Sequence, residues 1–137
     1  MLKTLKTSVL ASGFWSLKAP RWHLGALWVS DMRAGRVFRI DLDGKVTIVA
    51  DVPSQPSGLG FLLDGSLLVA SMTQRLILKF GAEKPTVHAD LTDVASGYLR
   101  DLSRRSRWKR ICDVFRRKCF RTRLLCVGSG SSDDAGW

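Results

Sequence analysis

The central part of the chain alternates apolar and polar residues in short runs, a pattern typical of β-strands. Two runs, Arg36–Asp41 and Lys45–Asp51, are rich in valine and isoleucine and flank the dipeptide Asp43-Gly44. An Asp-Gly pair between two such runs is a strong signal for a β-hairpin. A third run of the same kind, Leu27–Asp31, precedes them. The pattern therefore predicts a small antiparallel sheet built from β-branched strands.

A second copy of this pattern follows about 40 residues later. Three segments of the first unit match three segments of the second unit in the same order: Trp28–Met32 with Leu68–Met72 at an offset of 40, Arg36–Ile40 with Arg75–Lys79 at 39, and Thr47–Asp51 with Thr86–Asp90 at 39. Each unit then holds about four short strands, which is the size of a β-propeller blade. The alternative is a β-sandwich with ordinary hairpins.

The connector between the two units is rich in turn-forming residues. It runs over Pro53–Gly58 and continues as Gly58-Leu59-Gly60-Phe61. In a propeller this passage leads from the outer strand of one blade to the inner strand of the next. We expect glycines here because the backbone must pass close to its neighbours near the crowded axis.

Several motifs in this region resemble a known protein family. They are P-x-W-x-x-G-x-L-W-x-S-D at Pro20–Asp31, R-x-x-R-x-D-x-D-G at Arg36–Gly44, and P-S-G-L-G-F followed by D-G-x-L-L-V-A at Pro56–Ala70. As an ordered set, over about residues 8–99, they resemble the senescence marker protein/gluconolactonase family, also called regucalcin-like. The resemblance implies an all-β fold within residues 8–102. That fold would be an incomplete β-propeller, with about two four-stranded blades of a six-bladed family fold.

The resemblance also implies a hydrolase that holds one divalent cation (Ca, Zn, Mg or Mn) and cleaves lactones; its relatives include phosphotriester-cleaving enzymes. Such a cation polarises the carbonyl group and activates water, and it needs oxygen ligands. The first family ligand is a glutamate, but Lys18 stands at its position. A protonated lysine offers no acceptor and repels a cation. The remaining family ligands belong to later blades.

The substrate contacts implied by the resemblance are altered as well. An Asn-Asp pair enters the third blade in the family, and Arg100-Asp101 stands in its place. Asp101 alone is therefore predicted to bind substrate, because Arg100 occupies the position of the Asn. No catalytic residue, metal ligand or cofactor is expected in this form. His23 and His88 lie on no catalytic motif, and we interpret His88 as structural or surface. Three acids are interpreted as turn and strand-end residues: Asp31, Asp51 and Asp90.

The last part of the chain has a different composition. Residues 100–137 carry 11 Lys/Arg and 4 Asp/Glu, against 11 and 8 in residues 1–99, so most of the net charge of +10 lies at this end. We predict that residues 103–137 form a non-family basic tail, either disordered or helical over Arg105–Leu125. The three cysteines in this tail, Cys112, Cys119 and Cys126, fit neither a zinc motif nor a disulfide framework. We favour a frameshift, because a shifted frame over Ser106–Val114 can encode a D-G-x-x-Y-V motif.

Two functional hypotheses follow. The first is a truncated gluconolactonase-like protein that is inactive as a hydrolase, with open blade edges that allow self-association. The alternative is a non-enzymatic module whose Arg-rich tail binds nucleic acid or an anionic membrane. No apolar run is long enough for a transmembrane helix. The predicted location is cytoplasmic; a signal peptide at Met1–Trp15 is the alternative to a first strand at Ser8–Leu10.

Overall fold

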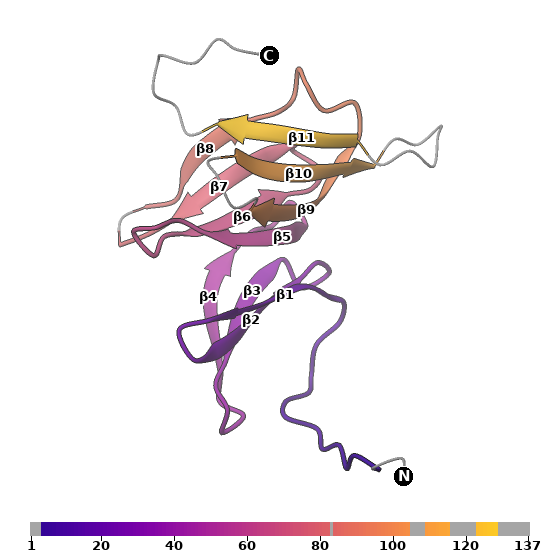
Figure 1. Cartoon of the computed structure of the whole chain (residues 1–137), viewed down its shortest axis with the longest axis vertical. Coiled ribbons are helices and arrows are strands. Elements are labelled where there is room, and N and C mark those ends of the chain that lie inside the picture. Colours follow the sequence, from indigo (N-terminus) through magenta and orange to yellow (C-terminus); the bar gives the residue numbers. More distant parts are fainter. Residues whose placement is uncertain (1–3, 83, 105–108, 116–122, 129–137) are drawn as a thin grey trace.

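The computed structural model describes residues 4–82, 84–104, 109–115 and 123–128, with side chains described as far as Leu102. Three antiparallel sheets follow one another along the chain, and the described residues include no helix. Figure 1 shows the first sheet in the lower half of the view and the second and third sheets together in the upper half. The described part of the chain accordingly holds no helix long and apolar enough to cross a membrane.

Each sheet is a meander in which consecutive strands are hydrogen-bonded neighbours. The first sheet contains β1 (Leu17–His23), β2 (Ala26–Asp31), β3 (Arg36–Ile40) and β4 (Val46–Asp51). The second contains β5 (Pro56–Phe61), β6 (Leu67–Ser71), β7 (Leu76–Phe80) and β8 (Thr86–Asp90). The third contains β9 (Tyr98–Arg104), β10 (Lys109–Phe115) and β11 (Arg123–Gly128). The predicted all-β fold with two four-stranded sheets is confirmed.

The predicted hairpin at Asp43-Gly44 connects β3 and β4. Gly44 has a φ of +86°, a conformation that glycine adopts without steric cost. Its backbone N–H donates to the Asp41 carbonyl at 2.9 Å, and the N–H of Lys45 donates to the Asp43 carboxylate at 3.0 Å. The local turn chemistry therefore sets the register of this strand pair.

The two four-stranded sheets confirm the repeat, with one correction to its register. The predicted offset of 39 for the third strand is wrong, because Arg36 pairs with Asp31 whereas Leu76 pairs with Ser71, which gives an offset of 40. The fourth strand keeps the predicted offset of 39. The second unit is therefore one residue shorter than the first between its third and fourth strands. This difference lies in the hairpin between β7 and β8, where a loop tolerates a deletion.

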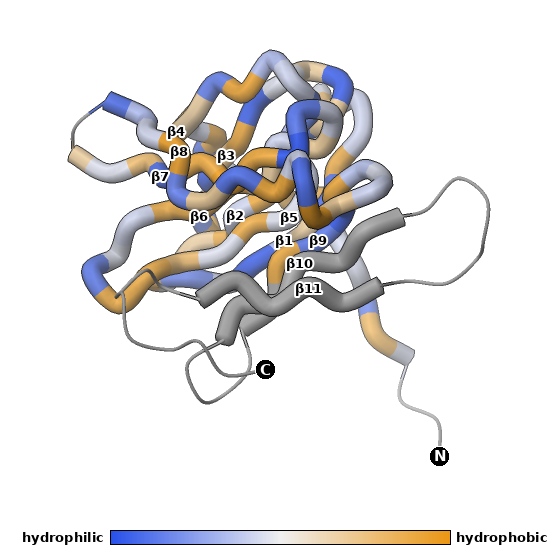
Figure 2. Tube along the Cα trace, turned by 90° about the horizontal axis from the view of Figure 1, so that it is seen from above, coloured by the Kyte–Doolittle hydropathy of each residue, from blue (hydrophilic) through white to orange (hydrophobic). Residues whose placement is uncertain are grey.

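The second sheet is buried on both faces. Successive residues of a strand point to opposite sides, so Leu67 and Val69 of β6 face the first sheet while Leu68 and Ala70 face the third. The alternation of hydropathy along the strands can be followed in Figure 2. The core between the first two sheets contains Val37, Ala50, Val52, Leu59, Leu67 and Val69. The core beyond β6 contains Leu68, Ala70, Ile77, Leu91, Ala95, Leu99 and Leu102.

The opposite face of the first sheet is only partly covered. Phe14, from the segment before β1, packs edge-on against Phe38 with ring centroids 5.2 Å apart. Next to Phe38, Ile48 on β4 remains 50% exposed, and Val46 further along the strand remains 39% exposed. This face therefore presents apolar surface that a further layer could cover.

The first strand predicted at Ser8–Leu10 is wrong. Residues 4–16 form no strand, and β1 begins at Leu17. The backbone N–H groups of Trp15 and Ser16 donate to the carboxylate of Asp31 and not to a neighbouring strand. The Asp31 carboxylate thus satisfies the two backbone N–H groups that come immediately before β1.

The helix predicted over Arg105–Leu125 is wrong for the described residues of that stretch. β9 continues to Arg104, and β10 pairs with both β9 and β11. Because β10 pairs with β9, its backbone is extended. Apolar residues that are three and four positions apart therefore do not share one face, as they would on a helix. For the same reason, the disorder predicted for residues 103–137 is wrong for the described residues, which lie in β9, β10 and β11. The frameshift stays a prediction, and residues 105–108, 116–122 and 129–137 lie outside the described residues.

Candidate functional site

The first strands of the three sheets, β1, β5 and β9, lie next to one another. Gly58 on β5 is so close to β9 that a Cβ atom at this position would lie 2.3 Å from the Leu102 backbone nitrogen. The hydroxyl of Ser57 donates to the Leu99 carbonyl at 2.9 Å, and the hydroxyl of Ser30 donates to the Ser57 carbonyl at 2.6 Å. The close backbone approach predicted for this glycine is therefore confirmed.

One side chain, Arg21 on β1, links all three strands. Its Nε donates to the Leu59 carbonyl at 3.1 Å, and its Nη2 donates to the Leu102 carbonyl at 2.7 Å. The same Nη2 forms an ion pair with the Asp101 carboxylate at 2.8 Å. Because the guanidinium donors form a rigid planar fork, they fix the spacing of the strands. Sequence reasoning missed this role, and no local pattern signals it, because the partners of Arg21 come from strands that lie 38 to 81 residues further along the chain.

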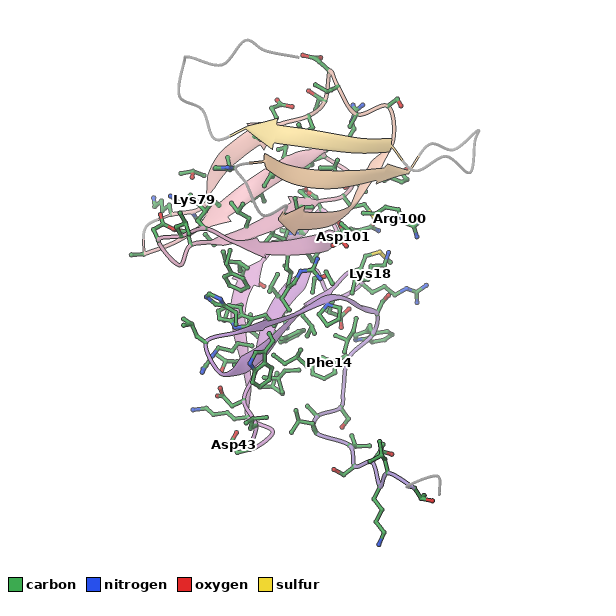
Figure 3. All side chains as sticks on the ribbon, viewed as in Figure 1. Phe14, Lys18, Asp43, Lys79, Arg100 and Asp101 are labelled. Atoms are coloured by element: carbon green, nitrogen blue, oxygen red, sulfur yellow. The ribbon has the colours of Figure 1, made fainter. Side chains whose placement is uncertain are left out.

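The predicted site residues come together beside Arg21. Figure 3 labels Lys18, Arg100 and Asp101 where β1 approaches β9. Lys18 is half-buried, and its ammonium forms no ion pair with the described carboxylates. Asp101, in contrast, is engaged twice, because its Oδ1 also accepts the backbone N–H of Leu102 at 2.8 Å. The structure therefore places Lys18 and Asp101 where β1 approaches β9, with Arg21 bound to the Asp101 carboxylate.

These residues do not fit the divalent cation that the resemblance implies. β1, β5 and β9 contain one carboxylate, Asp101, and Arg21 already binds it. A hard dication needs several oxygen ligands, whereas Lys18 and Arg21 bring positive charge to the same place. Within the ranges that the structure describes, no three His, Cys, Asp or Glu side chains are grouped to hold a metal.

His23 serves packing at the far end of β1 from Lys18. Its ring stacks on Phe61 with centroids 3.7 Å apart and contacts the edge of Trp28 at 6.1 Å. The Nε2 atom of His23 is buried and has no hydrogen-bond partner. His88 lies on β8, the last strand of the second sheet.

Asp31 has a larger role than the turn residue that the sequence predicted. It is fully buried, and its carboxylate accepts the backbone N–H groups of Trp15, Ser16, Arg33 and Ala34 at 2.7–3.2 Å. Burial raises the pKa of Asp31, but the four hydrogen bonds outweigh burial and leave the pKa below its ordinary value. Asp31 thereby fastens the segment before β1 to the turn after β2.

The other two predicted strand-end acids, Asp51 and Asp90, lie at the ends of β4 and β8. Asp51 forms an exposed ion pair with Arg36 at 3.2 Å. Asp90 accepts hydrogen bonds from the hydroxyl and the backbone N–H of Thr92, which lower its pKa. Both acids thus act on local structure, as the sequence predicted.

The fold is similar to that of three solved structures. A gluconolactonase from Xanthomonas campestris matches with a TM-score of 0.70 and 15% identity, over 88% of this chain and 46% of the other. A candidate gluconolactonase matches with a TM-score of 0.64 and 19% identity, over 77% of this chain and 38% of the other. A luciferin-regenerating enzyme matches with a TM-score of 0.63 and 16% identity, over 83% of this chain and 41% of the other.

The fold is that of part of a gluconolactonase-type propeller. The predicted resemblance is confirmed at the level of the fold, and the β-sandwich alternative is wrong. The chain spans less than half the length of each of these proteins. No protein-family model matches the chain, and no curated protein matches its sequence.

The alternative function, binding of nucleic acid or an anionic membrane, depends on the side chains of residues 103–137. Those side chains lie outside the described residues. This hypothesis therefore stays a prediction from charge alone.

Proposed function

We propose that the chain supplies three sheets of a gluconolactonase-like propeller and that, in this form, it does not hydrolyse lactones with a divalent cation. The observation that supports the proposal most directly is Lys18. It is a half-buried cation at the family's glutamate position, three residues before Arg21 on the same strand. The fold supports descent from a lactone hydrolase, while the side chains argue against its metal chemistry.

Metal-assisted lactone hydrolysis needs a cation that polarises the carbonyl group and lowers the pKa of a bound water. A dication placed beside β1 and β9 would meet the positive charges of Lys18 and Arg21. It would find Asp101 already bound to Arg21 and to a backbone N–H. The Lys18 ammonium can donate a hydrogen bond to a substrate oxygen, but it cannot hold a cation.

The test is hydrolysis of D-glucono-1,5-lactone by the full chain, followed by proton release, with calcium, zinc, magnesium or manganese added in turn. We expect the spontaneous rate with every metal and no metal-dependent rise in Tm. A saturable metal-dependent rate would overturn the proposal.

A matched pair of variants examines whether Lys18 is the obstacle. Lys18→Glu and Lys45→Glu make the same change in charge, but Lys45 is exposed on the β3–β4 hairpin. Divalent cations should raise the Tm of Lys18→Glu more than that of Lys45→Glu. Equal responses would show that the charge at Lys18 does not decide metal binding.

A further inference from the structure

We propose that the outer face of the first sheet docks on the third sheet of a second copy of this chain, so that two copies close one ring of sheets. The outer face is the side of the first sheet that points away from the second sheet. The inner face is already occupied, because Val37 and Ala50 lie in the core between the first two sheets. The inference concerns an interaction surface and goes beyond the proposed function.

The outer face is apolar across the whole width of the sheet. One row of cross-strand partners runs over all four strands and contains Trp22, Leu27, Ile40 and Val46. The next row on the same face contains Val29, Phe38 and Ile48. Phe14 contacts this face at Phe38, while Trp22 remains 61% exposed. An exposed apolar face of this kind is typical of a surface that binds a partner.

The internal repeat indicates what such a face packs against. Leu27 and Val29 correspond to Leu67 and Val69 of the second sheet, at an offset of 40. Leu67 and Val69 are buried because their side of the second sheet packs on the first sheet. The outer face of the first sheet therefore repeats a face that packs on the sheet before it, and the described residues hold no sheet before the first.

The third sheet offers the complementary face. Leu99 and Leu102 of β9 pack against the second sheet, so the other side of β9, which carries the exposed Tyr98, points away from it. That side corresponds to the face that each earlier sheet presents to the sheet after it. The second sheet lies between the first and the third (Figure 1). The third sheet of the same chain therefore cannot reach the outer face, whereas the third sheet of a second copy can.

The size of the chain points to two copies. It supplies three sheets, and its match to the gluconolactonase from Xanthomonas campestris covers 46% of that protein. Two copies therefore supply about the length of one such propeller. A contact between two different faces is heterologous, and it forms a closed ring when the rotation between copies returns to the start. With a two-fold axis the same contact forms twice, and neither face stays free.

The experiment is sedimentation velocity of the full chain over a range of concentrations. We expect a reversible equilibrium between monomer and dimer, without larger species. Trp22→Lys should raise the dissociation constant of the dimer at least about thirtyfold, because aromatic anchors dominate the binding energy of an interface. Leu63→Lys is the matched control, since Leu63 is exposed in the hairpin between β5 and β6 and its replacement should leave the dissociation constant unchanged. Both positions are exposed in the single chain, and circular dichroism checks that both variants fold.

A photo-cross-link identifies which faces meet. A benzophenone side chain in place of Trp22 keeps an aromatic group on the outer face, and a mixture of copies with natural and heavy nitrogen marks the cross-links between copies. We expect peptides that join residue 22 of one copy to residues 98–128, the third sheet, of the other. Four outcomes would each overturn the inference: a monomer at every concentration, an open-ended series of oligomers, equal dissociation constants for the two variants, or cross-links between the first sheets of two copies.

Discussion

Replacing Gly58 by alanine tests the approach of β5 and β9 on which the candidate site depends. The new Cβ would lie 2.3 Å from the Leu102 nitrogen, 2.6 Å from the Asp101 carbonyl carbon and 2.8 Å from the Asp101 Cα. All three are backbone atoms, so no side chain can rotate away. The two strands must separate by about 1 Å to restore ordinary van der Waals contact in a close-packed interior.

The cost of this separation can be worked out from the contacts involved. Overpacking a well-packed site typically costs about 1–3 kcal/mol. Moving β9 also strains the hydrogen bonds from Ser57 to Leu99 and from Arg21 to Leu102, each worth about 0.5–1.5 kcal/mol net. We therefore expect Gly58→Ala to lower the free energy of unfolding by about 3–5 kcal/mol, a large share of the ~5–15 kcal/mol typical of a domain.

Gly60→Ala is the matched control, two residues along the same strand. The nearest atom to its Cβ is the Leu102 Cβ at 4.0 Å, and neither glycine has a positive φ. Both substitutions restrict the unfolded chain equally, by about 0.4–1 kcal/mol, so the difference between them isolates the clash. Urea unfolding followed by tryptophan fluorescence measures that difference. Identical midpoints for the two variants would refute the close packing of β5 against β9.

Three further substitutions test other contacts. Arg21→Lys should lower the free energy of unfolding by about 1–3 kcal/mol because it loses hydrogen bonds to two strands, whereas Arg36→Lys, in an exposed ion pair, should cost less than about 1 kcal/mol; equal losses in chemical unfolding would contradict this. Asp31 has a lowered pKa, so its stabilisation is complete well above pH 3.8 and is lost as the pH falls through 3.8 towards the folded pKa. The difference in the free energy of unfolding between the parent and Asp31→Asn should therefore shrink below about pH 4. A difference that does not change with pH would count against the stabilising role of the four hydrogen bonds. Ile48→Lys should reduce self-association through the exposed face of the first sheet; sedimentation velocity that shows the same species in parent and variant would remove that face as the interface.

Local chemistry explains why the strands and hairpins could be predicted. Asp43-Gly44 specifies its turn without help from distant residues, and the period of about 40 residues follows from repeated burial between sheets. The one-residue error in the offset of β7 arose because a deletion in a loop leaves the apolar pattern of both flanking strands intact. The basic segment after Arg104 was predicted to be disordered or helical, because spacing alone does not reveal pairing with β9.

The candidate site was predictable only where a motif identified a position. Lys18, Arg100 and Asp101 were found because the resemblance aligned them, and the structure brings them to one place. Arg21 was missed because its partner Asp101 lies 80 residues away in the sequence, and no local pattern records a contact of that separation. The four hydrogen bonds of Asp31 depend in the same way on a segment that folds back from 15 and 16 residues earlier.

The positive charge of Arg21 at this site cannot be removed without disturbing the packing of β1, β5 and β9. Lys18→Glu alone would add one carboxylate, but Asp101 would remain bound to Arg21 and to a backbone N–H. Releasing Asp101 requires the loss of Arg21, which also supplies the hydrogen bonds to Leu59 and Leu102 that join β1 to β5 and β9. We therefore expect Lys18→Glu to gain a response to divalent cations in Tm without gaining lactone hydrolysis. An arginine that holds three strands together keeps the only carboxylate of those strands from serving a metal.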